Sequence, residues 1–376
     1  MPIRVAIVGC GGISRAHAAA YSHLSSTSLV AVCDNNPDNL QQRADENDVP
    51  GRYTDFTEMF EKEKLDLVSI CTHAPLHPTV AMAAADAGTH VLSEKPLALD
   101  LESADRMIEY CAKAGVKLAV SQQYRFDPTF RLAKQLVDEG RIGTPRLVRE
   151  IGKGREAGFD LMEMGVHYFD EMDFYMGGIE WIHAHATYLG HPVGVEDIMH
   201  SSQLCKTDRR DNGLVAGDPM LIQIGGSQGV SGLMELYYRE RKEGEGLANW
   251  MAGPHLLGDE GQLMIKPNPN TNRDELWYCS SDVSFAAHTP AWEHIVVPEQ
   301  DTLIEGKEWG MHTIWSVQNM VEAIHEDGQP ALGGDRAMRS LECISAVYES
   351  HFSADRVYLP LSDRRHPLEK RIQDKQ

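Results

Sequence analysis

The first third of the chain alternates short apolar runs with helical patterns, and this rhythm constrains the fold of the 376 residues more than any other feature. The apolar runs are continuous and rich in Val, Ile, Leu and Ala, which is typical of strands buried on both faces of a sheet. The expected strands are 4–8, 28–33, 65–71, 90–93 and 117–121, and the expected helices between them are 13–24, 38–47, 55–63, 77–87 and 101–114. This order predicts a doubly wound parallel sheet with crossover helices.

The rhythm changes after residue 123, where long strand-like runs with glycine turns begin to dominate. The elements expected there are a helix at 128–138, a strand near 146–152, a helix at 161–176, strands over 180–300, helices at 308–327 and 335–350, and an extended segment at 357–360. The charged tail beyond Ser362 is expected to be loose. We therefore predict an α/β domain over residues 1–123 and an α+β domain over 124–376 that contains a large, mostly antiparallel open sheet.

Length and charge limit the partners of such a chain. A chain of 376 residues is longer than one hydrophobic core normally serves, so two domains are expected. The net charge of −21 repels nucleic acid phosphates and anionic membrane surfaces at long range. No stretch reaches the ~20 apolar residues of a membrane-spanning helix, and the strand pattern that begins at Ile3 leaves no room for a signal peptide. We expect a cytoplasmic protein that binds neither nucleic acid nor membrane.

Cysteine and histidine spacing argues against a metal site. The seven cysteines are scattered and include no Cys-x-x-Cys pair, so neither a disulfide framework nor a structural zinc site is supported. His183 and His185 would share a strand face, but two histidines without a nearby third ligand make a poor metal site. The sequence predicts no metal.

A glycine turn joins the first expected strand to the first expected helix. Residues 5–17 read Val-Ala-Ile-Val-Gly-Cys-Gly-Gly-Ile-Ser-Arg-Ala-His, which places Gly9 and Gly11 at the turn. In dinucleotide-binding turns the backbone approaches a pyrophosphate here, and a side chain at Gly11 would obstruct it. The unpaired amides at the helix start then face the phosphates, aided by the helix dipole. The third fingerprint position is Ser14 instead of Gly or Ala, a small departure because this residue only has to let the helix pack near the strand.

Asp34 ends the second expected strand, where it favours one dinucleotide over another. A carboxylate at this point accepts hydrogen bonds from both ribose hydroxyls and repels a 2′-phosphate. We therefore expect NAD, with NADP as the less favoured cofactor. The alternative interpretation is a glycine turn beside an unrelated acidic loop residue.

Residues 88–96, Gly-Thr-His-Val-Leu-Ser-Glu-Lys-Pro, resemble the Glu-Lys-Pro signature of the Gfo/Idh/MocA family of sugar and polyol dehydrogenases. The other features that agree in order and spacing are the N-terminal fingerprint, residues 123–128 (Gln-Tyr-Arg-Phe-Asp-Pro), 165–170 (Gly-Val-His-Tyr-Phe-Asp), 258–261 (Gly-Asp-Glu-Gly) and the closing stretch 350–360. The resemblance spans nearly the whole chain. It implies a Rossmann domain, followed by an open-sheet domain that shapes the substrate pocket and often mediates dimers or tetramers.

The resemblance also implies which residues contact the cofactor. They are Gly9, Gly11, Gly12, Ile13, Asp34, Thr72, His73, His77, Glu94, Lys95 and Gln123. The loop after the third buried strand departs from the family, which often has Thr-Pro-Asn with a His three residues later. This chain keeps His77 but lacks the Pro-Asn pair.

The family's Asp-x-x-x-His catalytic pair falls on Glu163 and His167, with Glu in place of the commoner Asp. A histidine, with an unperturbed pKa of about 6.5, takes and returns a hydroxyl proton near neutrality. Lys95 carries an ammonium that polarises the substrate oxygen, lowers the histidine's pKa or relays the proton. Glu163 orients the imidazole or binds a second hydroxyl. For Asp170 three roles stay open: capping, pairing with Arg125, or substrate contact.

Together these features predict a hydride transfer between a nicotinamide cofactor and the hydroxyl or keto carbon of a sugar, polyol or glycoside. The residues expected to bind the substrate are Lys95, Arg125, Arg155, Glu163 and His167. One alternative is an NAD-dependent glycosidase or lyase that oxidises its substrate transiently, eliminates, and regenerates tightly held NAD. A second alternative is a dinucleotide sensor without catalysis, but a sensor has no need of a proton-transfer pair.

Overall fold

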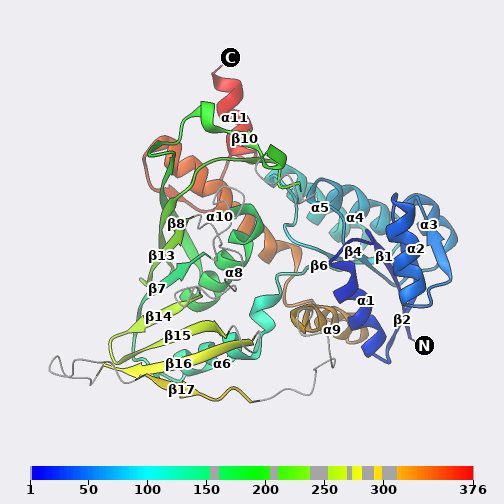
Figure 1. Ribbon diagram of the computed structural model, residues 1–376, viewed down its shortest axis with the longest axis horizontal. Coiled ribbons are helices and arrows are strands. Elements are labelled where there is room, and N and C mark those ends of the chain that lie inside the picture. The colour runs from blue at the N-terminus through cyan, green and yellow to red at the C-terminus, as the bar shows by residue number, and fades with distance from the viewer. Residues whose placement is uncertain are drawn as a thin grey trace. The chain divides into compact units, whose positions relative to one another are not determined.

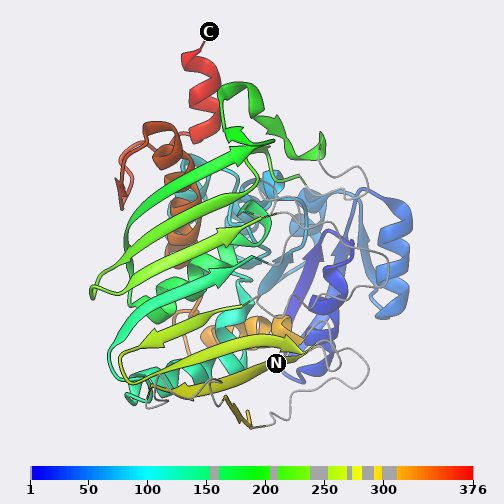
Figure 2. The ribbon, with the colours of Figure 1, turned by 60° about the vertical axis from the view of Figure 1, so that its left-hand side comes forward.

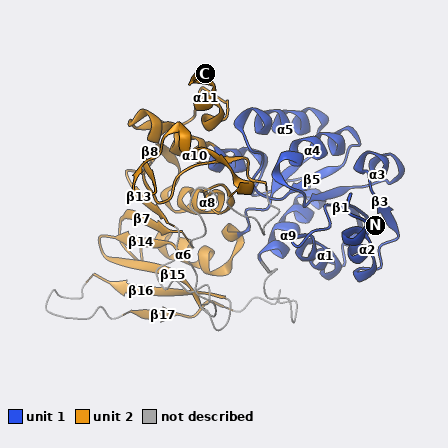
Figure 3. Cartoon of the chain, turned by 45° about the horizontal axis from the view of Figure 1, so that its top comes forward, with its two compact units in different colours: residues 1–123, 301–341 blue, residues 124–300, 342–376 orange. Residues whose placement is uncertain are grey.

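The computed structural model describes residues 2–152, 161–203, 211–237, 253–268, 273–281, 292–298 and 311–375. The chain divides into two compact units, which Figure 3 colours separately: residues 1–123 with 301–341 form unit 1, and 124–300 with 342–376 form unit 2. The sequence assigned 301–341 to the second domain. These residues group with unit 1 because Ile314, Val317 and Met320 of helix α9 (Met311–His325) are buried in the core of unit 1.

Unit 1 contains a six-stranded sheet in the order β3-β2-β1-β4-β5-β6, and every pairing in it is parallel (Figure 1). Its strands are β1 (Ile3–Val8), β2 (Thr27–Cys33), β3 (Gly51–Tyr53), β4 (Leu67–Ile70), β5 (His90–Ser93) and β6 (Leu118–Val120). The edge strand β3 was not expected, because three residues are too few to show a pattern. The order 3-2-1-4-5-6 is that of a Rossmann fold, which places the ligand crevice at the carboxyl ends of β1 and β4.

Helices cover both faces of this sheet. They are α1 (Ser14–His23), α2 (Pro37–Glu46), α3 (Phe56–Lys62), α4 (His77–Asp86), α5 (Leu101–Ala114) and α9, with a 3-10 turn η1 (Ala74–Leu76). Figure 3 shows α3, α4 and α5 on one face and α1, α2 and α9 on the other. Because both faces are covered, Ala6 and Ile7 of β1, whose side chains point to opposite faces of the sheet, are both fully buried. Asp100 caps α5 by accepting from the amide of Ser103 at 2.7 Å, and Gly115 ends it with a φ of 71°.

Unit 2 is built on a ten-stranded sheet with the order β17-β16-β15-β14-β7-β13-β12-β8-β18, and β9 pairs with β8. The strands are β7 (Pro145–Ile151), β8 (Ile179–Tyr188), β9 (His191–Pro192), β12 (Met220–Gly226), β13 (Ser231–Leu236), β14 (His255–Gly258), β15 (Gly261–Asn268), β16 (Arg273–Ser280), β17 (Glu293–Ile295) and β18 (Val357–Tyr358). Only the β7–β13 pairing in this sheet is parallel. A separate pair joins β10 (Met199–His200) to β11 (Leu214–Val215). The predicted fold class is confirmed.

Helix α6 (Pro128–Asp138), helix α8 (Gly165–Met176) and the part of α10 (Gly334–Ser353) that belongs to unit 2 lie on one face of the large sheet (Figure 2). Three short 3-10 turns complete the unit: η2 (Gln123–Phe126), η3 (Val195–Asp197) and η4 (Ser201–Gln203). Ser350 of α10 ties this helix to the sheet, because its Oγ accepts from the amide of Ala184 on β8 at 2.9 Å.

The tail beyond Ser362 is helical over α11 (Pro367–Asp374), so the expectation of a loose tail is wrong. His366 caps the helix, since its Nδ1 accepts from the amide of Leu368 at 3.2 Å. Leu368 is fully buried, and Lys370 and Arg371 each pair with Glu349 at 3.1 Å. The charged side chains of Lys370 and Arg371, which suggested a solvated tail, therefore form ion pairs that hold the tail against the rest of unit 2. Within the described part of the chain, no helix has both the length and the apolarity to cross a membrane.

Candidate active site

The turn between β1 and α1 contains Gly9, Gly11 and Gly12, and the reason for glycine at Gly9 differs from the reason at the other two. Gly9 has a φ of +93°, and a Cβ atom there would lie 2.6 Å from the backbone carbonyl of Cys71. Glycine at this position is thus required by the packing of the turn on the end of β4. At Gly11 and Gly12 an added Cβ would meet no protein atom within 4 Å. The open space there suits the close approach of a pyrophosphate.

The start of α1 is open to an anion. Its N-cap residue, Ile13, offers no side-chain acceptor, and no acidic residue lies in the first turn. Helix α2 differs, because Asn36 caps it by accepting from the amides of Asp38 and Asn39. No side-chain acceptor and no acidic charge therefore compete with an anion at the positive end of the α1 dipole.

Asp34 follows β2 and is joined to the glycine turn. Its Oδ2 accepts from the amide of Cys10 at 2.6 Å, and its Oδ1 accepts from the amide of Asn36 at 2.7 Å. Each carboxylate oxygen has a second acceptor site. The side chain therefore fixes the turn and keeps acceptors for the hydroxyls of a ribose.

A buried polar network holds Glu94, the residue before Lys95. The Oε1 of Glu94 lies 2.9 Å from Nε2 of His17 on α1, and Nδ1 of His17 lies 2.9 Å from Oγ of Ser69 on β4. The hydroxyl of Tyr21 reaches the same Oγ at 2.6 Å. Sequence reasoning missed His17, although it is a polar residue within an otherwise small, apolar stretch of α1, which was an available signal.

The network keeps the Glu94 carboxylate ionised. Burial by itself raises the pKa of this carboxyl, but the hydrogen bond from His17 and the charges of His17 and Lys95 outweigh burial and leave the pKa below its ordinary value. Oε2 of Glu94 accepts from the amide of Lys95 at 3.3 Å. The carboxylate thus holds the peptide that carries the lysine. The Lys95–Pro96 bond is cis.

His77 joins the loop after β4 to the Glu-Lys-Pro segment. Its Nδ1 lies 2.8 Å from the carbonyl of Pro96, and its Nε2 lies 3.1 Å from the carbonyl of Thr72. Burial lowers the pKa of His77, and a neutral ring has one N–H to donate to these carbonyls. Both ring nitrogens of His77 therefore face backbone carbonyls. His73, in the same loop, is exposed.

Gln123 has a buried side-chain acceptor. Its Oε1 has no hydrogen-bond partner among the described residues, as expected of an acceptor that binds a ligand amide.

His167, in unit 2, lies on the first turn of α8 and is buried. The ring of Tyr124 packs against it edge-on, with centroids 4.7 Å apart. Glu163 lies before α8, because the expected helix 161–176 is interrupted at Met164. The Oε2 of Glu163 accepts from Nδ2 of Asn212 at 3.5 Å. Asn212 gave no sequence signal, since it belongs to a loop 49 residues away.

The structure selects one of the three roles left open for Asp170. Arg125 binds its carboxylate with two parallel hydrogen bonds of 2.9 and 2.7 Å, and donates to its backbone carbonyl at 2.9 Å. The guanidinium also lies 4.6 Å from the ring centroid of Phe174. Asp170 is buried and Arg125 nearly so, and the pair therefore fastens η2 to α8.

The candidate residues thus divide between the two units. Unit 1 carries those of the glycine turn, the loop after β4 and the Glu-Lys-Pro segment, and unit 2 carries Tyr124, Arg125, Glu163 and His167. Arg155 lies outside the described residues. Within the described ranges, no group of three or more His, Cys, Asp or Glu side chains could hold a metal ion.

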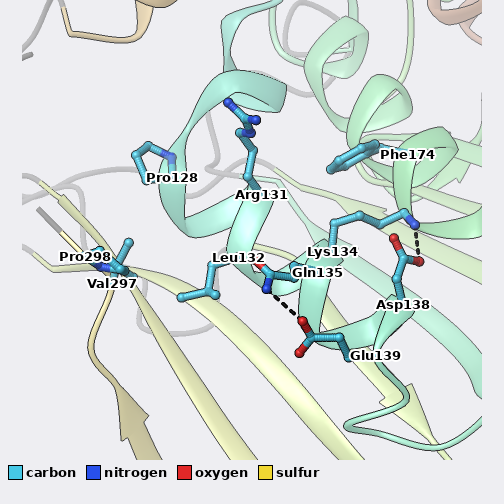
Figure 4. A pocket seen from close by; sticks show the side chains of 10 residues that line it. All are labelled: Pro128, Arg131, Leu132, Lys134, Gln135, Asp138, Glu139, Phe174, Val297 and Pro298. Carbon is cyan, nitrogen blue, oxygen red and sulfur yellow. Dashed lines mark hydrogen bonds and ion pairs between the residues drawn. The ribbon is translucent and has the colours of Figure 1, made fainter. Parts of the chain in front are cut away.

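A hollow of about 610 Å³ on unit 2 contains none of these residues (Figure 4). Helix α6 lines most of it, together with Phe174, Val297 and Pro298. Its polar side chains are partly used within the helix, because Lys134 pairs with Asp138 and Gln135 donates to Glu139. The hollow therefore gives no alternative catalytic centre.

Comparison with known proteins gives matches over the first unit and beyond. Residues 3–122 match the family model described as an oxidoreductase family with an NAD-binding Rossmann fold. The D-apiose dehydrogenase of Paraburkholderia graminis is 26% identical over 92% of this chain and 86% of its own length. The myo-inositol 2-dehydrogenase of Thermotoga maritima is 32% identical over 46% of this chain, and the chain spans 55% of that protein.

Solved structures share the fold over almost the whole chain. A levoglucosan dehydrogenase in complex with NADH superposes with a TM-score of 0.76 at 20% identity, covering 96% of this chain and all of that one. An oxidoreductase from Agrobacterium radiobacter, in complex with NAD+, L-tartaric acid and magnesium, gives a TM-score of 0.75 at 18% identity, covering 95% and 98%. At these identities the likeness establishes the fold.

Proposed function

We propose that the chain, whose residues 3–122 match the family model of the Gfo/Idh/MocA oxidoreductases with their NAD-binding Rossmann fold, is an NAD(P)-dependent dehydrogenase acting on the hydroxyl or keto carbon of a sugar, polyol or glycoside. The relatives reported above act on apiose and inositol. The observation that carries the proposal is the glycine turn, with open space at Gly11 and Gly12 and an uncapped helix start. The alternative of a glycosidase or lyase has no support among these relatives.

NAD is the proposed cofactor, in preference to NADP. Asp34 supports this choice because its carboxylate repels a 2′-phosphate and accepts from ribose hydroxyls. Two further side chains of unit 1 support contacts with the cofactor: Oε1 of Gln123, which has no hydrogen-bond partner among the described residues, and the exposed His73. When bound, the nicotinamide supplies the hydride acceptor, and the protein supplies binding, orientation and charge.

The proton chemistry is assigned to three side chains. His167 takes the hydroxyl proton during oxidation and returns it during reduction, because an imidazole exchanges protons near neutrality. Lys95 stabilises the oxygen as negative charge develops. Glu163 holds a substrate hydroxyl or orients His167, and its bond to Asn212 limits its movement.

Arg155 is retained as a proposed substrate contact. For Arg125 we propose an indirect role, because three of its hydrogen bonds go to Asp170. Its neighbour Tyr124 packs on His167, so the Arg125–Asp170 pair positions that ring contact. Arg125 thus supports the substrate site through Tyr124.

A homo-oligomer and a cytoplasmic location complete the proposal. One face of the large sheet carries α6, α8 and α10, and the other carries no helix of the described residues (Figure 2). The six described cysteines are buried and form no disulfide, which suits a reducing compartment. Light scattering after gel filtration measures the oligomeric state, and a monomer at micromolar concentration would contradict a dimer or tetramer.

The function is tested by NADH absorbance with a panel of inositols, aldoses, glycosides and their keto forms. The wild type is expected to reduce NAD with at least one compound, and Lys95→Ala is expected to lose that signal while still binding NAD. Cleavage of a glycoside without net NADH would favour the glycosidase alternative. No Lys95-dependent signal with either NAD or NADP would overturn the dehydrogenase proposal.

A further inference from the structure

A buried arginine lies on the side of the glycine turn that faces α2. Arg43 is 2% exposed, although arginine is rarely buried without a purpose. Its Nε donates to Oγ of Ser14 at 2.8 Å, and its Nη2 points to the carbonyls of Cys10 and Gly11 at 3.5 and 3.4 Å. Its Nη1 pairs with Glu46 one turn later on α2. One guanidinium therefore spans the turn, the start of α1 and α2.

Ser14 belongs to the same arrangement. Its side chain is fully buried, and its Oγ donates to the carbonyl of Gly11 at 2.6 Å while it accepts from Arg43. Ser14 occupies the third fingerprint position, where Gly or Ala is usual for close helix packing. The departure in this sequence is thus a hydroxyl that bonds the turn.

The direction of these bonds determines where the amides of the turn point. In a trans peptide the C=O and the N–H point in opposite directions. The carbonyls of Cys10 and Gly11 face Arg43 and Ser14, so the N–H groups of Gly11 and Gly12 point away from α2. The space around those two glycines is open. Asp34 holds the preceding amide, that of Cys10, at 2.6 Å.

We propose that Arg43 and Ser14 are positioning residues that aim the amides of Gly11 and Gly12 at the pyrophosphate of the dinucleotide. This inference rests on the proposed function. The planar fork of arginine is needed, because one group has to reach a hydroxyl and two carbonyls at once, which the point charge of lysine does not reproduce. The guanidinium also places positive charge behind the phosphate-binding turn, partly offset by Glu46.

The test compares Arg43→Met, Arg43→Lys and Ser14→Ala with the wild type. Methionine keeps much of the buried stem, and Glu46 is 41% exposed and stays hydrated without its partner, so Arg43→Met is expected to fold. Arg52→Met is the matched control, because Arg52 also pairs with a carboxylate of α2, Asp45 at 2.7 Å, but does not contact the turn. Urea melts establish which variants are folded at the assay temperature, and Ser14→Ala provides the test if Arg43→Met is not.

Calorimetry then measures the Kd of NAD, of ADP-ribose, which keeps the pyrophosphate, and of adenosine, which lacks it. Arg43→Met is expected to raise the Kd of NAD and ADP-ribose roughly tenfold, the loss of one or two hydrogen bonds to a charged group. Ser14→Ala is expected to raise it less, and Arg43→Lys to recover only part of the affinity. The Kd of adenosine in these variants, and all three Kd values in Arg52→Met, are expected to stay within about twofold of wild type.

A folded Arg43→Met protein with wild-type affinity for NAD would overturn the inference. Equal weakening of adenosine binding and NAD binding in Arg43→Met would also overturn it, because that pattern indicates a general distortion of unit 1. If Arg43→Met does not fold, an unchanged Kd for NAD in Ser14→Ala would overturn the inference instead. A wild type that binds neither dinucleotide is a separate result, and it refutes the proposed function itself.

Discussion

His17 and Glu94, 77 residues apart in sequence, share a hydrogen bond of 2.9 Å in the interior of unit 1. The bond joins the helix that follows the glycine turn to the residue that precedes Lys95. A cofactor turn and a proposed catalytic lysine are thus held in one buried network, so a change in either partner is expected to affect both.

Replacing Glu94 by Gln tests that network through pH. The folded-state pKa of Glu94 is depressed, so its ionisation contributes stability above its unfolded value and loses that contribution as pH falls through the folded pKa. The stability gap between wild type and Glu94→Gln is therefore expected at pH 7 and should close on acidification below the ordinary value of 4.5. Urea unfolding at a series of pH values measures it. A gap that widens in acid would contradict this assignment.

Gly9→Ala and Gly11→Ala form a matched pair with opposite expectations. At Gly9 the positive φ and the contact with Cys71 are expected to destabilise the fold by about 2 kcal/mol or more. At Gly11 the added methyl meets no protein atom, so stability should be unchanged or slightly higher while NAD binding weakens. Thermal melts and NAD titrations separate the two effects. Normal NAD affinity in Gly11→Ala would mean that the open space is not the pyrophosphate site.

Asp34→Ala is expected to weaken the binding of NAD more than that of NADP. The carboxylate that this substitution removes accepts hydrogen bonds from the ribose hydroxyls of NAD and repels the 2′-phosphate of NADP. It should also lower stability by about 1–3 kcal/mol, since the amides of Cys10 and Asn36 lose their acceptor. The Kd values of both dinucleotides are therefore compared under conditions where melts show the variant folded. Equal weakening would remove the basis for choosing NAD.

Arg125→Ala is expected to destabilise unit 2 by about 3–5 kcal/mol, because it leaves Asp170 buried without its bidentate partner. Arg125→Met combined with Asp170→Leu should recover much of that loss, since the uncompensated charge is gone. Urea unfolding of Arg125→Met, Asp170→Leu and the double variant forms a double-mutant cycle. A raised KM for substrate with unchanged stability would instead show that Arg125 contacts substrate directly.

The local sequence pattern was sufficient to predict most strands and helices of unit 1. Continuous apolar runs identified its buried strands, and Gly11 and Asp34 lie at the turn and strand end that their spacing predicts. Long-range partners were not predictable, because nothing near Gly9 in the sequence indicates the backbone of Cys71, and nothing near Arg43 or His17 indicates the groups they bind.

The same reason explains the misplaced segment and tail. The pattern of α9 predicts a helix but not which core receives Ile314 and Val317. Likewise, the short α11 is held by the burial of Leu368 and by ion pairs to Glu349, a residue of another helix, and neither partner can be identified from the sequence of α11 itself. The catalytic roles of Lys95, Glu163 and His167 stay predictions, since geometry without substrate does not test them.

Dinucleotide binding itself is measured by calorimetric titration of the purified protein with NAD+. We expect saturable binding of one dinucleotide per chain, weakened in Gly11→Ala and preserved in Lys95→Ala. Absence of binding by NAD+ and NADP+ alike, in a protein that melts cooperatively, would contradict it.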